Sequence, residues 1–142
     1  MPRTSKAEAP GPRVITHLVV MKPRAGLSTR DREAFVEAFE HAVATISAVR
    51  AVRVGRRVTH GAEYEEGSPD AADFLIQIDF DDLAGLQTYL EHPAHEAVSA
   101  QFRRSLESGW VYDFETGDLT RLREFAEAGG GDAVGGPGVS RG

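Results

Sequence analysis

Residues 74–95, FLIQIDFDDLAGLQTYLEHPAH, place a strand pattern, a helix pattern and a helix break in immediate succession. The first seven residues alternate so that one strand face is entirely apolar: Phe74, Ile76, Ile78 and Phe80. Asp81 or Asp82 is placed to cap the helix that follows, whose leucines recur at helical spacing. That helix must end near Glu91, because the residue before a proline is disfavoured in the helical conformation. Pro93 itself suits the first turn of another helix.

The flanking segments add further strands and helices on both sides of this stretch. The predicted elements, in chain order, are a strand over 14–21, a helix after Ser28, strands over 49–59 and 74–80, a helix over 83–91, a third helix from Pro93, a strand over 110–114 and a short helix over 118–128. The third helix is expected to carry Leu106 on its apolar stripe and to end at Gly109. The short helix is expected to turn Leu119, Leu122 and Phe125 inward.

This order of elements predicts an α+β fold of the ferredoxin-like type, βαββααβ, with a four-stranded antiparallel sheet. In such a fold the helices cover one face of the sheet only, so the other face needs a cover. The second face of the 74–80 strand carries Leu75, Gln77 and Asp79, which is not a plainly water-facing set. We expect a second subunit on this face, so that two sheets pair into a dimeric α+β barrel.

Length and composition predict one domain over residues 13–128, which includes the short C-terminal helix. Residues 1–12 lack periodicity and residues 129–142 are rich in glycine, so both ends are predicted to be disordered tails. The formal net charge of -6 disfavours nucleic acid as a partner. No run is long and apolar enough to span a membrane, and no secretory signal pattern opens the chain, so we expect a cytoplasmic protein.

Proton-transfer groups gather at the helix break, where Tyr89, His92 and His95 lie close together in sequence. His95 precedes Phe102 by nearly two helical turns, so it belongs to the apolar stripe that faces the sheet. His17 alternates with apolar residues on the first strand and shares the face that meets the helices. We therefore predict that His17, Tyr89 and His95 converge between the sheet and the helices. His92 is predicted to be the N-cap of the third helix.

This set of residues suits proton transfer at carbon. A histidine can take a proton from a carbon flanked by carbonyl groups, and a tyrosine hydroxyl can hydrogen-bond the developing enolate oxygen. His95 as general base and Tyr89 as orienting donor therefore suit an aldol or Claisen ring closure. Neither a cofactor nor a metal is predicted, because the sequence lacks a dinucleotide fingerprint, a Glu-x-x-His pair and cysteine. The alternative role is structural, since buried histidines and tyrosines are often hydrogen-bonded core residues.

Four segments together resemble the stress-responsive A/B barrel (Dabb) family. They are, in chain order, His17-Leu18-Val19-Val20-Met21-Lys22, Val54-Gly55, the block Tyr89-x-x-His92-Pro93-x-His95, and the closing strand to Asp113-Phe114. The block around Pro93 is the most specific part. The resemblance covers residues 14–114 and implies a dimeric α+β barrel.

The resemblance also carries expectations about function. The family includes plant polyketide cyclases that need no cofactor, in which residues matching Tyr89 and His95 serve the chemistry. It implies an enzyme for a polyketide-like or aromatic carbonyl substrate, bound by His17, Phe74, Ile76 and Phe102. Phe74 stands near the position where the plant cyclases place a pocket histidine, so a different substrate is expected. Two alternatives stay open: a cofactor-independent monooxygenase on an aromatic substrate, and a non-catalytic stress-responsive homo-oligomer.

Overall fold

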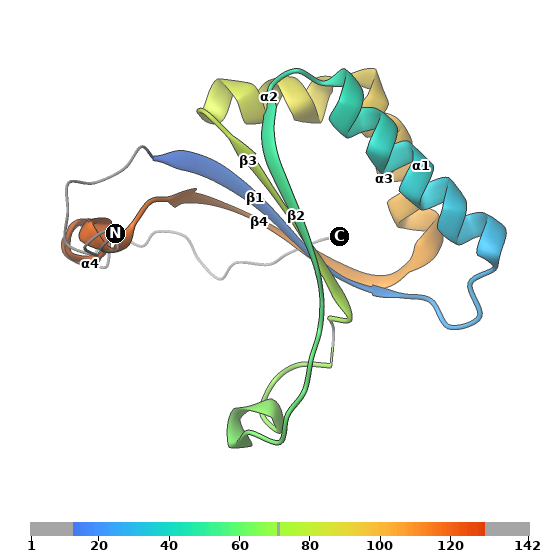
Figure 1. Ribbon diagram of the computed structural model, residues 1–142, viewed down its shortest axis with the longest axis horizontal. Coiled ribbons are helices and arrows are strands. Elements are labelled where there is room, and N and C mark those ends of the chain that lie inside the picture. The colour runs from blue at the N-terminus through green and yellow to red at the C-terminus, as the bar shows by residue number, and fades with distance from the viewer. Residues whose placement is uncertain (1–12, 71, 130–142) are drawn as a thin grey trace, which may run out of the picture.

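The computed structural model describes residues 13–70 and 72–129, which form a four-stranded sheet with helices against one face (Figure 1). The elements, in chain order, are β1 (Val14–Pro23), α1 (Thr29–Thr45), β2 (Val49–Arg56), β3 (Phe74–Phe80), α2 (Leu83–Glu91), α3 (Pro93–Ser105), β4 (Leu106–Thr116) and α4 (Leu122–Gly129). This order confirms the predicted ferredoxin-like arrangement with a short C-terminal helix. Of the two predicted tails, residues 1–12 and 130–142 lie outside the described residues, whereas Gly129 ends α4.

The sheet has the strand order β2-β3-β1-β4, and every neighbouring pair is antiparallel. At the centre, His17 of β1 lies opposite Ile78 of β3 and Asp113 of β4. Residues that lie opposite one another in a sheet share a face. The helix-covered face therefore carries His17 together with the alternating apolar residues of β3.

The helix boundaries follow from their capping residues. The Ser28 hydroxyl accepts a hydrogen bond of 3.0 Å from the backbone N–H of Asp31 and begins α1. Asp82, rather than Asp81, begins α2 by accepting a bond of 2.9 Å from the Gly85 N–H. Asp81 instead forms an ion pair with Arg50. The N-terminal capping predictions are thus confirmed, and for α2 the structure selects one of the two candidates.

The core lies between the sheet and α1, α2 and α3. Its most deeply buried large side chains are Ile46, Ile78, Phe80 and Tyr89. Phe80 is the last residue of the alternating apolar face of β3. Because this face points toward the helices, the Phe80 side chain lies in the core. This layer is the environment in which the predicted proton-transfer groups sit.

The end of α3 differs from the prediction. The helix ends at Ser105, and Leu106 already begins β4, where it pairs with Pro23 of β1. The expectation that the helix continues to Gly109 was wrong, because pairing with β1 draws residues 106–109 into the sheet. Gly109 lies inside the strand, opposite Met21. Leu106 still packs against the core.

The face of the sheet turned away from the helices is largely apolar at its surface. We call it the open face; its apolar residues are Leu18, Val20, Leu75, Trp110, Tyr112 and Phe114. At one end it carries a polar trio, in which the Thr16 hydroxyl donates to Asp79 at 2.8 Å and meets the Thr116 hydroxyl at 2.7 Å. This is the face on which the sequence predicts a second subunit.

The C-terminal helix lies apart from the helix layer, beyond the end of β4 (Figure 1). Arg13 holds it there by ion pairs with Glu115 and Glu124. Leu119 and Leu122 are 60% and 61% exposed, so the expectation that they turn inward was wrong, whereas Phe125 is half-buried. The reason is geometric: α4 packs closely only against the 3-10 turn Leu119–Arg121 before it. None of the helices described is both long and apolar enough to cross a bilayer.

Candidate active site

The aromatic rings of Tyr89 and His95 meet at the break between α2 and α3. Their centroids are 4.7 Å apart, and their planes are inclined by 60°. Tyr89 lies in the last turn of α2 and His95 in the first turn of α3, so Pro93 turns the chain between them. The break therefore lets the rings of Tyr89 and His95 meet. In one continuous helix, their separation would be set by the helix geometry.

A cavity of about 270 Å³ opens beside this pair, between the sheet and the helices. Its polar lining consists of His17, Tyr89, His95 and Ser99. The remaining walls are apolar and come from all three helices and from the sheet. An apolar cleft with a few convergent polar groups is typical of sites for small molecules. The predicted convergence of His17, Tyr89 and His95 is observed.

His17 is held by a carboxylate that the sequence analysis did not single out. Its Nδ1 lies 2.6 Å from an Asp113 carboxylate oxygen, a distance that indicates a strong hydrogen bond. The His17 side chain is 7% exposed, and that of Asp113 is 43% exposed. The pair forms because His17 and Asp113 lie opposite one another on β1 and β4. Strand register alone brings them together, so no local pattern in the sequence marks Asp113.

The three rings form a continuous series through the site. The centroids of His17 and Tyr89 are 5.8 Å apart in an edge-on arrangement, and Tyr89 then meets His95. On its other side Tyr89 packs against Phe80 at 5.3 Å. Asp113, His17, Tyr89 and His95 therefore follow one another from the rim of β4 to the start of α3.

Burial sets the protonation states of the two central groups. It raises the pKa of Tyr89 from 10.0 to about 12, because the phenolate would lose its hydration. It also lowers the pKa of His95 below its ordinary value of 6.5, with a further lowering by the charge of His17. A backbone hydrogen bond with Leu90 and the charge of Glu96 offset part of that decrease. At neutral pH, Tyr89 is therefore a proton donor for hydrogen bonds, and His95 is a neutral base.

The Tyr89 hydroxyl has no hydrogen-bond partner among the residues that the structure describes. Its residue is nevertheless only 2% exposed. Its oxygen is not among the described side-chain atoms that are fully enclosed and lack a partner, and Tyr89 lines the cavity. The hydroxyl is therefore available to a ligand in the cavity.

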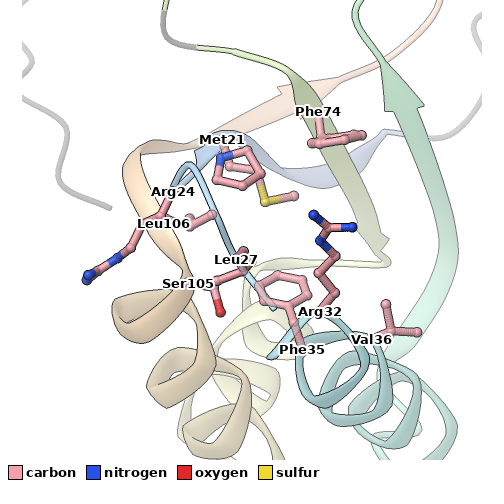
Figure 2. Close-up of a pocket in the computed structure, with 10 residues that line it drawn as sticks. Met21, Arg24, Leu27, Arg32, Phe35, Val36, Phe74, Ser105 and Leu106 are labelled. Carbon is pink, nitrogen blue, oxygen red and sulfur yellow. The ribbon is translucent and has the colours of Figure 1, made fainter. Parts of the chain in front are cut away.

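Of the other predicted substrate-binding residues, Ile76 and Phe102 line this cavity, and Phe74 does not. Phe74 instead lines a second cavity of about 440 Å³ under the β1–α1 connection (Figure 2). It shares the face of Ile76 but lies at the start of β3, opposite Met21 of β1. In Figure 2 the Arg32 side chain rises from α1 toward Phe74, while Arg24 points away from the cavity. Phe35 lines both cavities and packs against Phe102.

His92 has the structural role that the sequence predicts. Its Nδ1 accepts a hydrogen bond of 2.9 Å from the Ala94 N–H, which makes it the N-cap of α3. In that orientation the ring is committed to the helix end, while His95 faces the cavity. Within residues 13–70 and 72–129, no three histidine or acidic side chains gather as candidate metal ligands.

Comparison with known proteins supports this description. Residues 15–116 match the family model described as the Stress responsive A/B Barrel Domain. The chain is 23% identical over 100 residues to olivetolic acid cyclase from Cannabis sativa, covering 70% of this chain and 94% of the cyclase. Its fold resembles that of a hydroxynitrile lyase from Passiflora edulis, with a TM-score of 0.61, 14% identity, and coverage of 75% and 95% of the two chains. It also resembles a dimeric ferredoxin-like protein of unknown function from Thermobifida fusca, with a TM-score of 0.58, 20% identity, and coverage of 74% and 92%.

Proposed function

Because this chain belongs to the stress responsive A/B barrel domain family, we propose that it is a homodimeric, cofactor-free enzyme that closes rings in polyketide-like or aromatic carbonyl compounds. The observation that carries the proposal is the contact of Tyr89 with His95 at the wall of a mostly apolar cavity. The similarity to a cyclase over most of the chain supports the same reaction class.

The first step is removal of a proton from the carbon between two carbonyl groups. His95 takes that proton and becomes an imidazolium, while the electron pair of the C–H bond forms an enolate. The lowered pKa of His95 keeps the ring unprotonated, and so ready to act, at neutral pH. The enolate carbon then attacks a distant carbonyl of the same molecule, which forms the ring bond and leaves an alkoxide. The imidazolium returns its proton to that alkoxide, so His95 is regenerated.

Tyr89 stabilises the oxygen on which charge develops. Its hydroxyl donates a hydrogen bond to the enolate oxygen from a fixed position beside His95. Its raised pKa, about 12, keeps the proton on the phenol throughout the cycle. Water is largely excluded from this position, which strengthens the interaction. Tyr89 thus orients the substrate and lowers the barrier without exchanging a proton.

His17 and Asp113 act as positioning residues in this proposal. The 2.6 Å bond between them fixes the tautomer and orientation of the His17 ring. That ring in turn supports the edge of Tyr89 and borders the cavity. Ile76 and Phe102 supply apolar walls for the substrate. We assign no substrate contact in this cavity to Phe74, which lines the neighbouring one.

The homodimer is proposed on two grounds. The open face carries exposed Leu75, Tyr112 and Phe114, an apolar surface that a second sheet would cover. Structural neighbours from Thermobifida fusca, Bacteroides fragilis and Jannaschia are described as dimeric ferredoxin-like proteins. Pairing two open faces would produce the dimeric barrel that the sequence predicts.

The test uses a panel of linear β-polyketones and hydroxylated aromatic ketones, with ring-closed products measured by liquid chromatography and mass spectrometry. His95→Ala should lower kcat/KM by about 10²–10⁴-fold, and Tyr89→Phe by about 10²–10³-fold. His41→Ala, on the exposed side of α1, is the matched control and should keep full activity. Full activity in both site variants would refute the assigned roles. Oxygen consumption during turnover would identify the monooxygenase alternative instead.

The pH profile provides a second readout of the same assignment. Because His95 must be unprotonated, kcat/KM should fall on the acid side with a midpoint below 6.5. No basic limb from Tyr89 is expected until pH approaches about 12. An acid limb above 6.5 would show that a different group is the base.

A further inference from the structure

Two features project from the fold on the side of the open face (Figure 1). One is α4, which follows β4 and lies at the left of the view. The other is the segment 57–70 between β2 and β3, which lies at the bottom; we call it the lobe. The open face of the sheet lies between these two arms. Each arm extends an edge strand, since β4 and β2 are the two edges of the sheet.

The α4 arm has an apolar side that its own chain leaves uncovered. Leu119 and Leu122 are largely exposed, and the helix packs closely only against the turn before it. An isolated helix of eight residues is unstable in water, so such a helix needs a surface to pack on. Residues after 116 also lie beyond the family match, so α4 is an addition to the family domain.

The lobe is an ordered structure rather than a loose loop. The Glu65 carboxylate accepts hydrogen bonds of 2.8 Å from the backbone N–H groups of both His60 and Gly61. Gly61 has a φ of +92°, a conformation that favours glycine. The Ser68 hydroxyl adds a bond of 2.9 Å to the Tyr64 carbonyl. These bonds fix the conformation of the lobe around Tyr64.

A groove of about 790 Å³ separates the lobe from the open face. Its apolar walls are Val20, Leu75, Trp110 and Tyr112 of the sheet and Val58 and Tyr64 of the lobe. Val58 is 76% exposed and adds apolar surface beside that of the open face. The groove also carries Arg56, which has no acidic partner in the part of the chain that the structure describes. Glu65 and Asp73 also line the groove, so its polar part carries both signs of charge beside the apolar walls.

We propose that α4 of one chain docks into the groove beside the lobe of a second copy, and that the second copy returns the same contact. A two-fold axis that pairs two open faces turns each α4 toward the second copy, because α4 and the lobe both project on the open-face side of the sheet (Figure 1). Charge is mixed on both sides, since α4 carries Arg123 with Glu124 and Glu127, and the groove carries Arg56 and Arg57 with Glu65 and Asp73, so the match rests on apolar contact. A membrane surface is a poorer match, since helices that lie on membranes carry mainly Lys and Arg on their polar side.

This inference rests on the proposed homodimer and adds the contact that closes it. The sheet faces alone would leave Leu119 and Leu122 exposed in the dimer. Docking α4 on the second copy covers both leucines at the lobe side of the groove, where Val58 and Tyr64 lie, while the sheet of the second copy covers the open-face walls. Each subunit makes this contact with the other, so the dimer would contain it twice. We call this pair of α4–lobe contacts the clasp.

The absence of cysteine from the chain allows a direct test by disulfide formation. Leu122→Cys and Val58→Cys variants carrying different tags are co-expressed and oxidised mildly. The expected product is a mixed disulfide between the two variants, visible on a non-reducing gel. Leu83→Cys, at a 54% exposed leucine of α2 on the helix side, is the control and should give no mixed product with Val58→Cys. In a separate measurement, Leu122→Asp should raise the dimer dissociation constant by about tenfold.

The outcomes separate the clasp from the dimer and from the chemistry. A wild-type dimer in sedimentation without the mixed disulfide, or with Leu122→Cys linked to itself, would overturn the docking and leave the dimer standing. A wild-type monomer would overturn both. A mixed disulfide together with an unchanged dissociation constant for Leu122→Asp would also count against the clasp. Ring-closing activity is assayed independently, so its absence would not affect this result.

Discussion

The hydroxyl of Tyr89 is a polar group placed where a phenylalanine would pack equally well. Its ring lies between Phe80 and His95, and the residue is almost fully buried. Burial raises its pKa to about 12, and no described residue hydrogen-bonds its oxygen. The fold therefore gains nothing from the hydroxyl itself. Its position is better explained by an interaction with a molecule in the cavity than by a contribution to folding.

Tyr89→Phe should consequently leave stability unchanged within about 0.5 kcal/mol, or raise it slightly, because no internal hydrogen bond is lost. Thr16→Val is the matched control. It removes a hydroxyl bonded to Asp79 and Thr116, and should cost about 1–3 kcal/mol by leaving those groups unsatisfied. Urea unfolding at fixed protein concentration measures both. A loss above about 1.5 kcal/mol for Tyr89→Phe would mean that the hydroxyl has a structural partner.

At the scale of elements, local chemistry made the helix break predictable. A cap, a proline and an apolar stripe each act over a few residues, so the start of α3 and the direction of His95 follow from neighbouring positions. The same holds for the alternating face of β3, which is observed over the predicted residues Phe74–Phe80. The predicted order of strands and helices, βαββααβ, then indicated the ferredoxin-like fold.

Features that depend on long-range register were not predictable in this way. Asp113 joins the site only because β4 pairs with β1 in one register, which no local pattern specifies. The same pairing ends α3 at Ser105 and moves Leu106 into a strand. For α4, helical periodicity correctly indicated an amphipathic helix, but periodicity does not reveal which surface the apolar side meets. Tertiary pairing decided each of these cases.

The cap of α3 is an element whose contribution can be measured alone. His92→Ala removes the acceptor for the Ala94 N–H and should lower the free energy of unfolding by about 1 kcal/mol. His92→Asn keeps an acceptor at the N-cap and should stay within about 0.5 kcal/mol of wild type. Urea unfolding again provides the measurement. Equal losses in the two variants would show that the ring of His92 matters for packing rather than for capping.

For the molecule as a whole, the two faces of the sheet serve separate purposes. The cavity lies between the helices and the sheet, whereas the proposed dimer contact uses the open face. Only the sheet lies between the two. The chemistry and the assembly are therefore separable by mutation, even though both contribute to a stable protein.

Tyr112→Arg, on the open face, should yield a monomer because it places a charge in the proposed sheet-to-sheet contact. Val36→Arg, at an equally exposed position on α1, should remain a dimer. If the wild type is a dimer, its thermal midpoint should rise with protein concentration, and that dependence should vanish in the Tyr112 variant, since only a coupled association makes the midpoint depend on concentration. Sedimentation and thermal scans over a concentration series measure both properties. If Val36→Arg dissociates and Tyr112→Arg does not, then the subunits meet through their helices, and the sheet has its open face toward solvent.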